Sequence, residues 1–197
     1  QCSGFIYGLQ LADAHMRAGL AKHVLLVGAE VHTAFMPYGE ASWARLAGAL
    51  STPMPQDEWD FNTQVRHLAV LFGDGAAAVV VQAYEGEGRG VIDHLIGADG
   101  TDFRRLWIPS VGTRYRPYMD ASILERREQW PQMDGRYVFK MATTKMAEAA
   151  QQILARNGVR PEDLSLVLMH QANRRINEYV QKLLGLPDSK IIHNIHK

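Results

Sequence analysis

The stretch LVLMHQANRRINEYVQKLLGL, residues 166–186, changes its pattern in the middle and constrains the fold more than any other segment. Four consecutive apolar residues open it, which predicts a short buried strand. From Ile176 the apolar residues recur at helical spacing, and Gly185 is typical of the residue that ends a helix. The polar residues 170–173 lie between the two patterns. A polar junction of this kind is typical of the carboxyl edge of an α/β sheet, where such folds place functional residues.

A helix followed by a strand is predicted once in each half of the chain. In the first half, residues 3–21 have apolar side chains at helical spacing, and residues 23–31 form a β-rich run that predicts a buried parallel strand. In the second half, residues 138–157 predict a helix and residues 165–169 a strand. This weak internal echo and the mixture of the two element types indicate an α/β protein.

The middle of the chain has less regular patterns. Residues 66–84 predict two strands around the turn Gly73-Asp74-Gly75, and residues 90–100 predict another strand. Residues 34–65 and 101–132 are rich in proline, glycine and aromatic residues and lose periodicity. We therefore expect 34–65 to be a long inserted loop, and loops of this length usually have a function.

Composition excludes several classes of protein. The 21 basic and 21 acidic residues balance, so there is no electrostatic case for nucleic acid or an acidic membrane surface as a partner. No apolar run approaches the length of a membrane span. Cys2 is the single cysteine, which leaves no internal disulfide and indicates a reducing compartment, the cytoplasm. The chain begins without Met and stops within a strand pattern, so we expect a fragment lacking both ends.

Cys2 directly precedes the predicted helix that opens at Ser3. A thiol in that position faces unpaired backbone N–H groups and the positive end of the helix dipole, both of which favour thiolate. Gly4 and Gly8 leave room for a substrate or a second backbone. On position alone Cys2 better fits a small buried cysteine. Together with His170, it forms a nucleophile-and-partner pair.

Four blocks in series, QCSGFIYGL, LFGDGAAAVVV, GRYVFKMATTKMAE and HQANRRINEYVQKLLGL, resemble the β-ketoacyl-acyl-carrier-protein synthase III family of the thiolase superfamily. The resemblance implies a thiolase-type αβαβα layered sandwich of two pseudo-repeated halves, present here in part. Residues 1–130 would belong to the N-terminal half, with the nucleophile helix and the inserted loop, and residues 131–197 to the C-terminal half, with the His motif. It also implies that the helix after Cys2 is buried between layers.

The resemblance assigns chemistry to two residues. Cys2 matches the nucleophile that takes an acyl group from an acyl thioester, usually acyl-CoA, and its backbone N–H would form half of an oxyanion hole. His170 matches the histidine that, with an asparagine, stabilises the enolate left when a malonyl thioester, malonyl-acyl carrier protein or malonyl-CoA, loses CO2. That enolate then attacks the acyl-cysteine in a Claisen condensation. A neutral imidazole that donates its N–H suffices for this role.

The resemblance also assigns binding roles. Arg66 aligns with an arginine that packs on the CoA adenine, and Phe139 with a residue at the pantetheine entrance. Lys140, Arg175 and Lys182 align with basic positions that meet the acidic carrier protein; a solvated helix face is the other reading of these three.

The resemblance also implies features that would lie beyond the last of these blocks. The family's second enolate-stabilising residue is an asparagine in a Gly-Asn-Thr loop beyond the strand that IIHNIHK resembles, so Asn194 is not that residue. The second glycine of the oxyanion hole would also lie downstream. His193 and His196 would point to opposite faces of a strand, so we expect no metal site there.

The sequence therefore predicts an acyltransferase that condenses an acyl-cysteine with a malonyl thioester, in fatty-acid initiation or related polyketide metabolism. Two alternatives stay open: transfer of the acyl group from Cys2 to an alcohol or amine without condensation, and a non-catalytic scaffold. We expect no resident cofactor, since CoA or phosphopantetheine thioesters are substrates, and we expect a homodimer.

Overall fold

The computed structural model describes residues 2–33, 36–86 and 88–195, which fall into two compact units. The first unit comprises Gln1–Gly28, Ala76–Asp99 and Arg136–Lys197, and the second comprises Ala29–Gly75 and Gly100–Gly135. The boundary predicted at residue 130 separates two pseudo-repeated halves of the chain, and compact units do not test such a repeat. That boundary therefore stays a prediction. Within the described residues, no helix combines the length and apolar character that crossing a bilayer requires.

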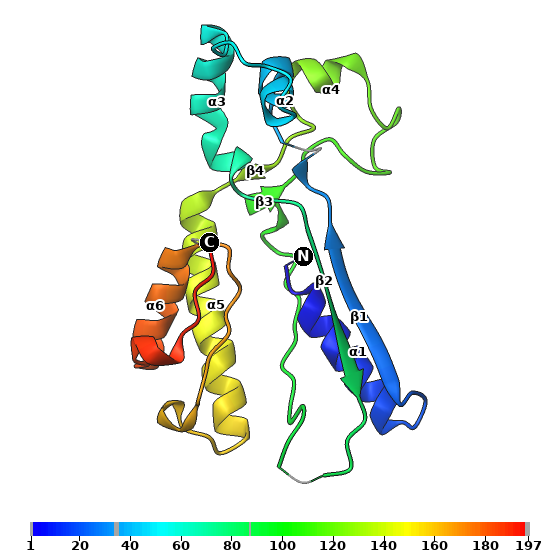
Figure 1. Cartoon of the computed structure of the whole chain (residues 1–197), viewed down its shortest axis with the longest axis vertical. Coiled ribbons are helices and arrows are strands. Elements are labelled where there is room, and N and C mark those ends of the chain that lie inside the picture. The colour runs from blue at the N-terminus through cyan, green and yellow to red at the C-terminus, as the bar shows by residue number, and fades with distance from the viewer. Residues whose placement is uncertain (1, 34–35, 87, 196–197) are drawn as a thin grey trace. The chain divides into compact units, whose positions relative to one another are not determined.

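Helix α1 and a two-stranded sheet form one part of the first unit. The predicted helix is confirmed as α1, Gly4–Arg17, and the strand after it as β1, His23–Glu30. Strand β1 pairs with β2, Gly75–Gln82, and the two run in opposite directions (Figure 1). The prediction of a buried parallel strand is wrong for this pair, because β1 has its partner in an antiparallel neighbour and most of its side chains are exposed.

Helix α1 is also more exposed than predicted. Ala12 is its one buried residue, and large apolar side chains such as Leu11 stay exposed among the described residues. Helix α1 packs on the sheet at Gly8, where an added Cβ would collide with the Leu26 side chain of β1. Leu26 of β1 thus packs against one face of α1.

Helices α5 and α6 carry the hydrophobic core of the first unit. Helix α5, Gly135–Arg156, and α6, Arg174–Leu184, confirm the two helices predicted for the second half (Figure 1). Gly185 ends α6 in the left-handed conformation, with φ 66°, as its position predicted. The buried core residues are Ala147, Val180, Leu184, Leu186 and Ile191. The 3-10 turns η3, Pro161–Asp163, and η4, Asp188–Lys190, connect the surrounding segments.

The strand predicted at 165–169 is reduced to one parallel bridge between Val167 and Ile191. Val167 and Met169 pack against the core, whereas Leu166 and Leu168 are exposed. One face of this extended segment is therefore buried, as the alternation of side chains in an extended chain requires. The apolar run had indicated burial on both faces, which is wrong.

No strand forms at 90–100 within the described chain, although one was predicted. The carbonyl groups of this segment are bound by side chains instead of a neighbouring strand. Arg17 donates to the Val91 carbonyl at 3.1 Å, Arg156 donates to the His94 carbonyl, and the Tyr7 hydroxyl donates to the Gly97 carbonyl at 2.6 Å. These three carbonyl groups therefore have side-chain partners in place of a sheet ladder.

The segment 34–65 contains helices where a loop was predicted. Helix α2 is Glu40–Leu46 and α3 is Gln56–Ala69. The Glu58 carboxylate accepts hydrogen bonds from the Ser42 amide at 2.6 Å and the Ala41 amide at 3.2 Å, and so satisfies the unpaired amides at the start of α2. Pro55 precedes α3 as its N-cap, a place where proline costs no hydrogen bond. Pro55, one of the prolines that suggested a loop, therefore marks the start of a helix.

Residues 66–84 do not form a hairpin, because Arg66 lies in the last turn of α3 and only β2 follows. Asp74 nevertheless fixes a strand end: its carboxylate accepts from the amides of His32 at 2.7 Å and Thr33 at 2.9 Å, just after β1. The remaining elements of the second unit are short: η2 Phe103–Arg105, β3 Leu106–Trp107, α4 Ala121–Glu125 and β4 Gln132–Met133. Strands β3 and β4 pair antiparallel.

Candidate active site

Cys2 lies just before the N-terminus of α1. Ser3 is the N-cap, with no side-chain hydrogen bond to the helix, so the first amides of α1 have no partner from that side chain. These amides and the helix dipole favour negative charge near Cys2. Cys2 is exposed and free of any disulfide, so a substrate can reach its thiol.

His170 shifts the pKa of the Cys2 thiol. Hydrogen bonding to its imidazole is the main cause that lowers the pKa of Cys2 below its ordinary value of 9.0; partial burial opposes it, and the charge of His170 adds to it. The same bond raises the pKa of His170 above 6.5, again against partial burial. The two shifts agree in direction, and both favour a thiolate that accepts a hydrogen bond from an imidazolium.

The residues after His170 hold the histidine in place. The Gln171 amide nitrogen donates to the Met169 carbonyl at 3.0 Å and to the Ile192 carbonyl at 3.1 Å, and its oxygen accepts from the Asn194 amide at 3.0 Å. The Asn173 side chain accepts from the Arg175 amide at 2.9 Å and caps α6. In the polar junction, Gln171 therefore bridges neighbouring segments and Asn173 caps α6, while the catalytic role of His170 stays a prediction.

The two glycines near Cys2 differ in their surroundings. A Cβ at Gly4 would meet no heavy atom within 4 Å, which leaves open space beside the first turn of α1, as expected for an approaching substrate. Gly8 is instead filled by Leu26 of β1. The room that the sequence predicted at Gly8 is thus used for packing helix against strand.

The predicted binding residues fall into both units. In the first unit, the Phe139 ring of α5 contacts the Tyr179 ring of α6 edge-on, with centroids 6.1 Å apart. Arg175 and Lys182 lie seven residues apart on α6, so they share one exposed face, and Lys140 is exposed on α5. Arg66 lies on α3 of the second unit. The roles of these five residues in binding stay predictions.

The sequence reasoning missed the roles of two asparagines, one at the start of α6 and one within it. Asn173 could have been found, because asparagine directly before a helix pattern is a common N-cap. Asn177 of α6 is fully buried, and neither polar atom of its side chain has a partner among the described residues. Nothing in the sequence around Asn177 indicates that its side chain is buried without a hydrogen-bond partner. The described residues include no cluster of three His, Cys, Asp or Glu side chains suited to a metal ion, and His196 lies outside them.

Comparison with known proteins gives the family. The family described as 3-oxoacyl-[acyl-carrier-protein (ACP)] synthase III matches residues 1–49 and 57–100, and its C-terminal region matches residues 154–197. Beta-ketoacyl-[acyl-carrier-protein] synthase III of Chlorobium luteolum is 32% identical over 194 residues, which cover 98% of this chain and 51% of that protein. The protein of the same name from Caldanaerobacter subterraneus is 35% identical over 198 residues, covering 100% and 51%.

A solved structure agrees. The crystal structure of beta-ketoacyl-[acyl-carrier-protein] synthase III from Thermus thermophilus matches with a TM-score of 0.74 and 33% identity over 98% of this chain and 50% of that one. The chain thus spans about half the length of the curated relatives it matches. The predicted fold class, α/β of the thiolase type, is confirmed. This chain belongs to the 3-oxoacyl-[acyl-carrier-protein] synthase III family.

Proposed function

We propose that the protein loads an acyl group from an acyl thioester onto Cys2 and condenses it with a malonyl thioester by decarboxylative Claisen condensation. The observation that carries this proposal is the place of Cys2 at the start of α1, where His170 lowers the pKa of its thiol. Acyl-CoA is the proposed donor and malonyl-acyl carrier protein or malonyl-CoA the proposed extender, in fatty-acid initiation or a related polyketide pathway. The names of the relatives support the same activity.

The first half-reaction follows from the charge state of the pair. The Cys2 thiolate attacks the thioester carbonyl, the C–S bond to CoA breaks, and the acyl group stays on Cys2. The leaving CoA thiolate takes up the proton that His170 had held. Once Cys2 is acylated, the thiolate that raised the pKa of His170 is gone, so the imidazole becomes neutral.

The second half-reaction uses that neutral imidazole. When the malonyl thioester loses CO2, negative charge develops on its carbonyl oxygen, and the His170 N–H can donate a hydrogen bond to it. The carbanion attacks the acyl carbonyl, and Cys2 leaves as a thiolate beside His170. The product is a 3-oxoacyl thioester, and the starting state of the pair returns when His170 gains a proton.

The remaining predictions follow as part of the same proposal. Arg66 would pack on the adenine of CoA and Phe139 would line the pantetheine entrance. Lys140, Arg175 and Lys182 would meet an acidic carrier protein, supported by the exposed basic face of α6. We also infer a homodimer in the cytoplasm without a resident cofactor; a single cysteine fits a reducing compartment.

An assay with both substrates separates the candidate functions. The purified protein is incubated with acyl-CoA and malonyl-acyl carrier protein, and CO2 and the 3-oxoacyl product are measured. Both should appear in equal amounts. An acyl adduct without decarboxylation would favour transfer to an alcohol or amine, and no adduct at all would favour a scaffold. The contact between Cys2 and His170 argues against the scaffold, because a scaffold has no need of an activated thiol.

A further inference from the structure

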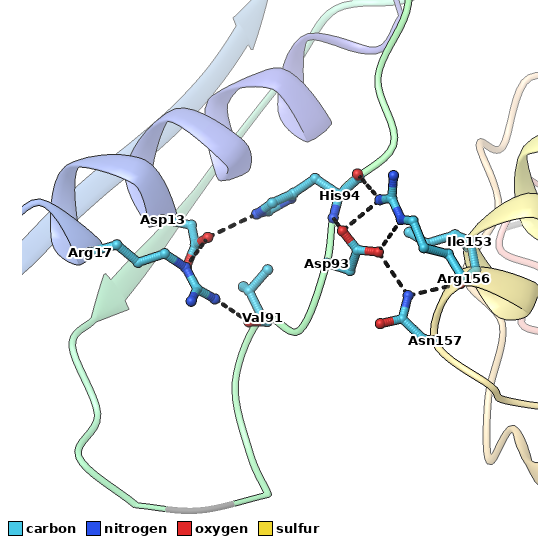
Figure 2. Close-up of polar contacts among 8 residues, drawn as sticks. All are labelled: Asp13, Arg17, Val91, Asp93, His94, Ile153, Arg156 and Asn157. Carbon is cyan, nitrogen blue, oxygen red and sulfur yellow. Dashed lines mark hydrogen bonds and ion pairs between the residues drawn. The ribbon is translucent and has the colours of Figure 1, made fainter.

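A network of polar side chains joins the far end of the nucleophile helix to α5. Figure 2 shows its members on three segments: Asp13 and Arg17 on α1, residues 91–94 between, and Arg156 and Asn157 at the end of α5. All lie in the first compact unit.

Asp93 is the centre of this network. Its carboxylate accepts two hydrogen bonds from the Arg156 guanidinium, at 2.6 and 2.5 Å, and one from the side-chain amide of Asn157 at 2.8 Å (Figure 2). These contacts lower the pKa of Asp93 from 3.8 to about 2, with Arg156 as the largest cause. A two-pronged arginine–carboxylate pair fixes direction as well as distance, so Asp93 cannot slide along the end of α5.

The neighbouring residue makes the connection to α1. The His94 ring nitrogen Nε2 lies 3.2 Å from Asp13 Oδ2, and the two side chains are 13% and 19% exposed. Arg17 holds the same Asp13 oxygen at 2.7 Å and also donates to the Val91 carbonyl (Figure 2). The segment 91–94 is thus bound to α1 on one side and to α5 on the other.

The hydrophobic core of the unit does not extend to α1 in the part of the chain that the structure describes. The hydrophobic core of the unit consists of residues from α5, α6 and the segments beside them, and it includes none from α1. Ala12 is the one buried residue of α1. The polar contacts of the network are thus a direct connection between α1 and the end of α5.

Helix α1 is connected to the rest of the unit near both of its ends, by Cys2 and His170 at its start and by the network toward its C-terminus. Cys2 stands at the start of α1, and α1 ends at the network. From Arg156, helix α5 leads into the core that Val167 and Met169 join, directly before His170. A hydrogen bond tolerates a shift of only a few tenths of an ångström. By fixing the position of α1, the network can keep the thiol and the imidazole within hydrogen-bonding distance.

We propose that Asp93 is a positioning residue, which through Arg156, His94 and Asp13 fixes α1 against α5 and so keeps Cys2 in hydrogen-bond contact with His170. The inference rests on the proposed function, since it concerns the same pair. Asp93 touches neither residue and acts only through the placement of their elements.

The test measures the reactivity of Cys2 without any acyl transfer. In the purified protein, the alkylation rate of the Cys2 peptide by iodoacetamide is followed by mass spectrometry from pH 5 to pH 10. In Asp93→Asn the apparent pKa of Cys2 should rise by about one unit, which lowers the rate at neutral pH about tenfold. Asp163→Asn is the matched control, because Asp163 has a similar two-pronged pair with Arg160 at 2.9 and 2.8 Å that does not involve α1.

A double variant identifies the route of the effect. Once His170→Asn has removed the imidazole, adding Asp93→Asn should change the alkylation profile no further, since the network acts through the Cys2–His170 contact. Asp13→Asn, which breaks the α1 end of the network, should reproduce the Asp93→Asn profile and serves if that variant does not fold.

Three results would overturn the inference: an unchanged profile in folded Asp93→Asn or Asp13→Asn, an equal shift in Asp163→Asn, or loss of folding in both network variants, which would make the network a stability element. Because alkylation needs no thioester, failure of the proposed function would appear separately, as an absent acyl adduct on a Cys2 that still shows the predicted profile.

Discussion

The thiol of Cys2 and the imidazole of His170 shift each other's pKa through hydrogen bonding, although Cys2 precedes α1 and His170 precedes α6. The bond lowers the pKa of the thiol and raises the pKa of the imidazole, so the pair favours the charged form of both groups. This charge state is the one that the proposed roles of nucleophile and proton donor require.

His170 should be needed more for condensation than for loading. In His170→Ala the pKa of Cys2 returns toward its ordinary value, so acylation at neutral pH should slow but persist. Formation of the 3-oxoacyl product should fall by roughly two orders of magnitude or more, because no N–H donor meets the enolate oxygen. Intact-mass measurement follows loading, and mass spectrometry of the product follows condensation. His23→Ala, at an exposed histidine of β1, is the control; product formation by His170→Ala at the control's rate would disprove the role.

Arg66 should matter for CoA donors and not for short thioester mimics. If its guanidinium stacks on the adenine, Arg66→Ala should raise the KM for acyl-CoA by about 3- to 30-fold and leave N-acetylcysteamine thioesters unaffected. Arg66→Lys keeps the charge and loses the planar group, so it should behave more like Arg66→Ala than like the parent protein. Steady-state kinetics with both donors decides the matter. Equal damage to both would indicate a structural role in α3.

Two buried amides of α6 should respond differently to replacement by leucine. Gln181 donates to the Leu186 carbonyl at 3.0 Å and to Asp188 at 2.7 Å, so Gln181→Leu leaves acceptors unpaired and should lower the free energy of unfolding by about 1–3 kcal/mol. Asn177 has no such partners among the described residues, so Asn177→Leu should be neutral or stabilising. Urea unfolding of both variants tests this. An equal loss in Asn177→Leu would mean that Asn177 has a partner in the folded protein.

The helices that carry the site could be predicted from the sequence because their apolar residues recur at helical spacing. Helix α1 was expected at 3–21 and is Gly4–Arg17; α5 was expected at 138–157 and is Gly135–Arg156. The pairing of Cys2 with His170 came from residue types and from the family resemblance, and both residues now lie in one unit.

The features that sequence reasoning missed depend on contacts between distant residues. Helix α2 has its first amides bound by Glu58, a residue of the next helix, and no pattern within α2 indicates this. The segment 90–100 has the composition of a strand, but side chains from α1 and α5 take its carbonyl groups. In both cases tertiary contacts override the local pattern, which is the usual reason such predictions fail.

The central claim is that Cys2 carries the acyl group, and intact-mass spectrometry tests it most directly. The purified protein is incubated with a panel of acyl-CoAs, and its mass should rise by one acyl group. Cys2→Ala should gain nothing, whereas Ser3→Ala should load normally, because the Ser3 side chain makes no capping hydrogen bond that α1 would lose. A full acyl adduct on Cys2→Ala would contradict the account.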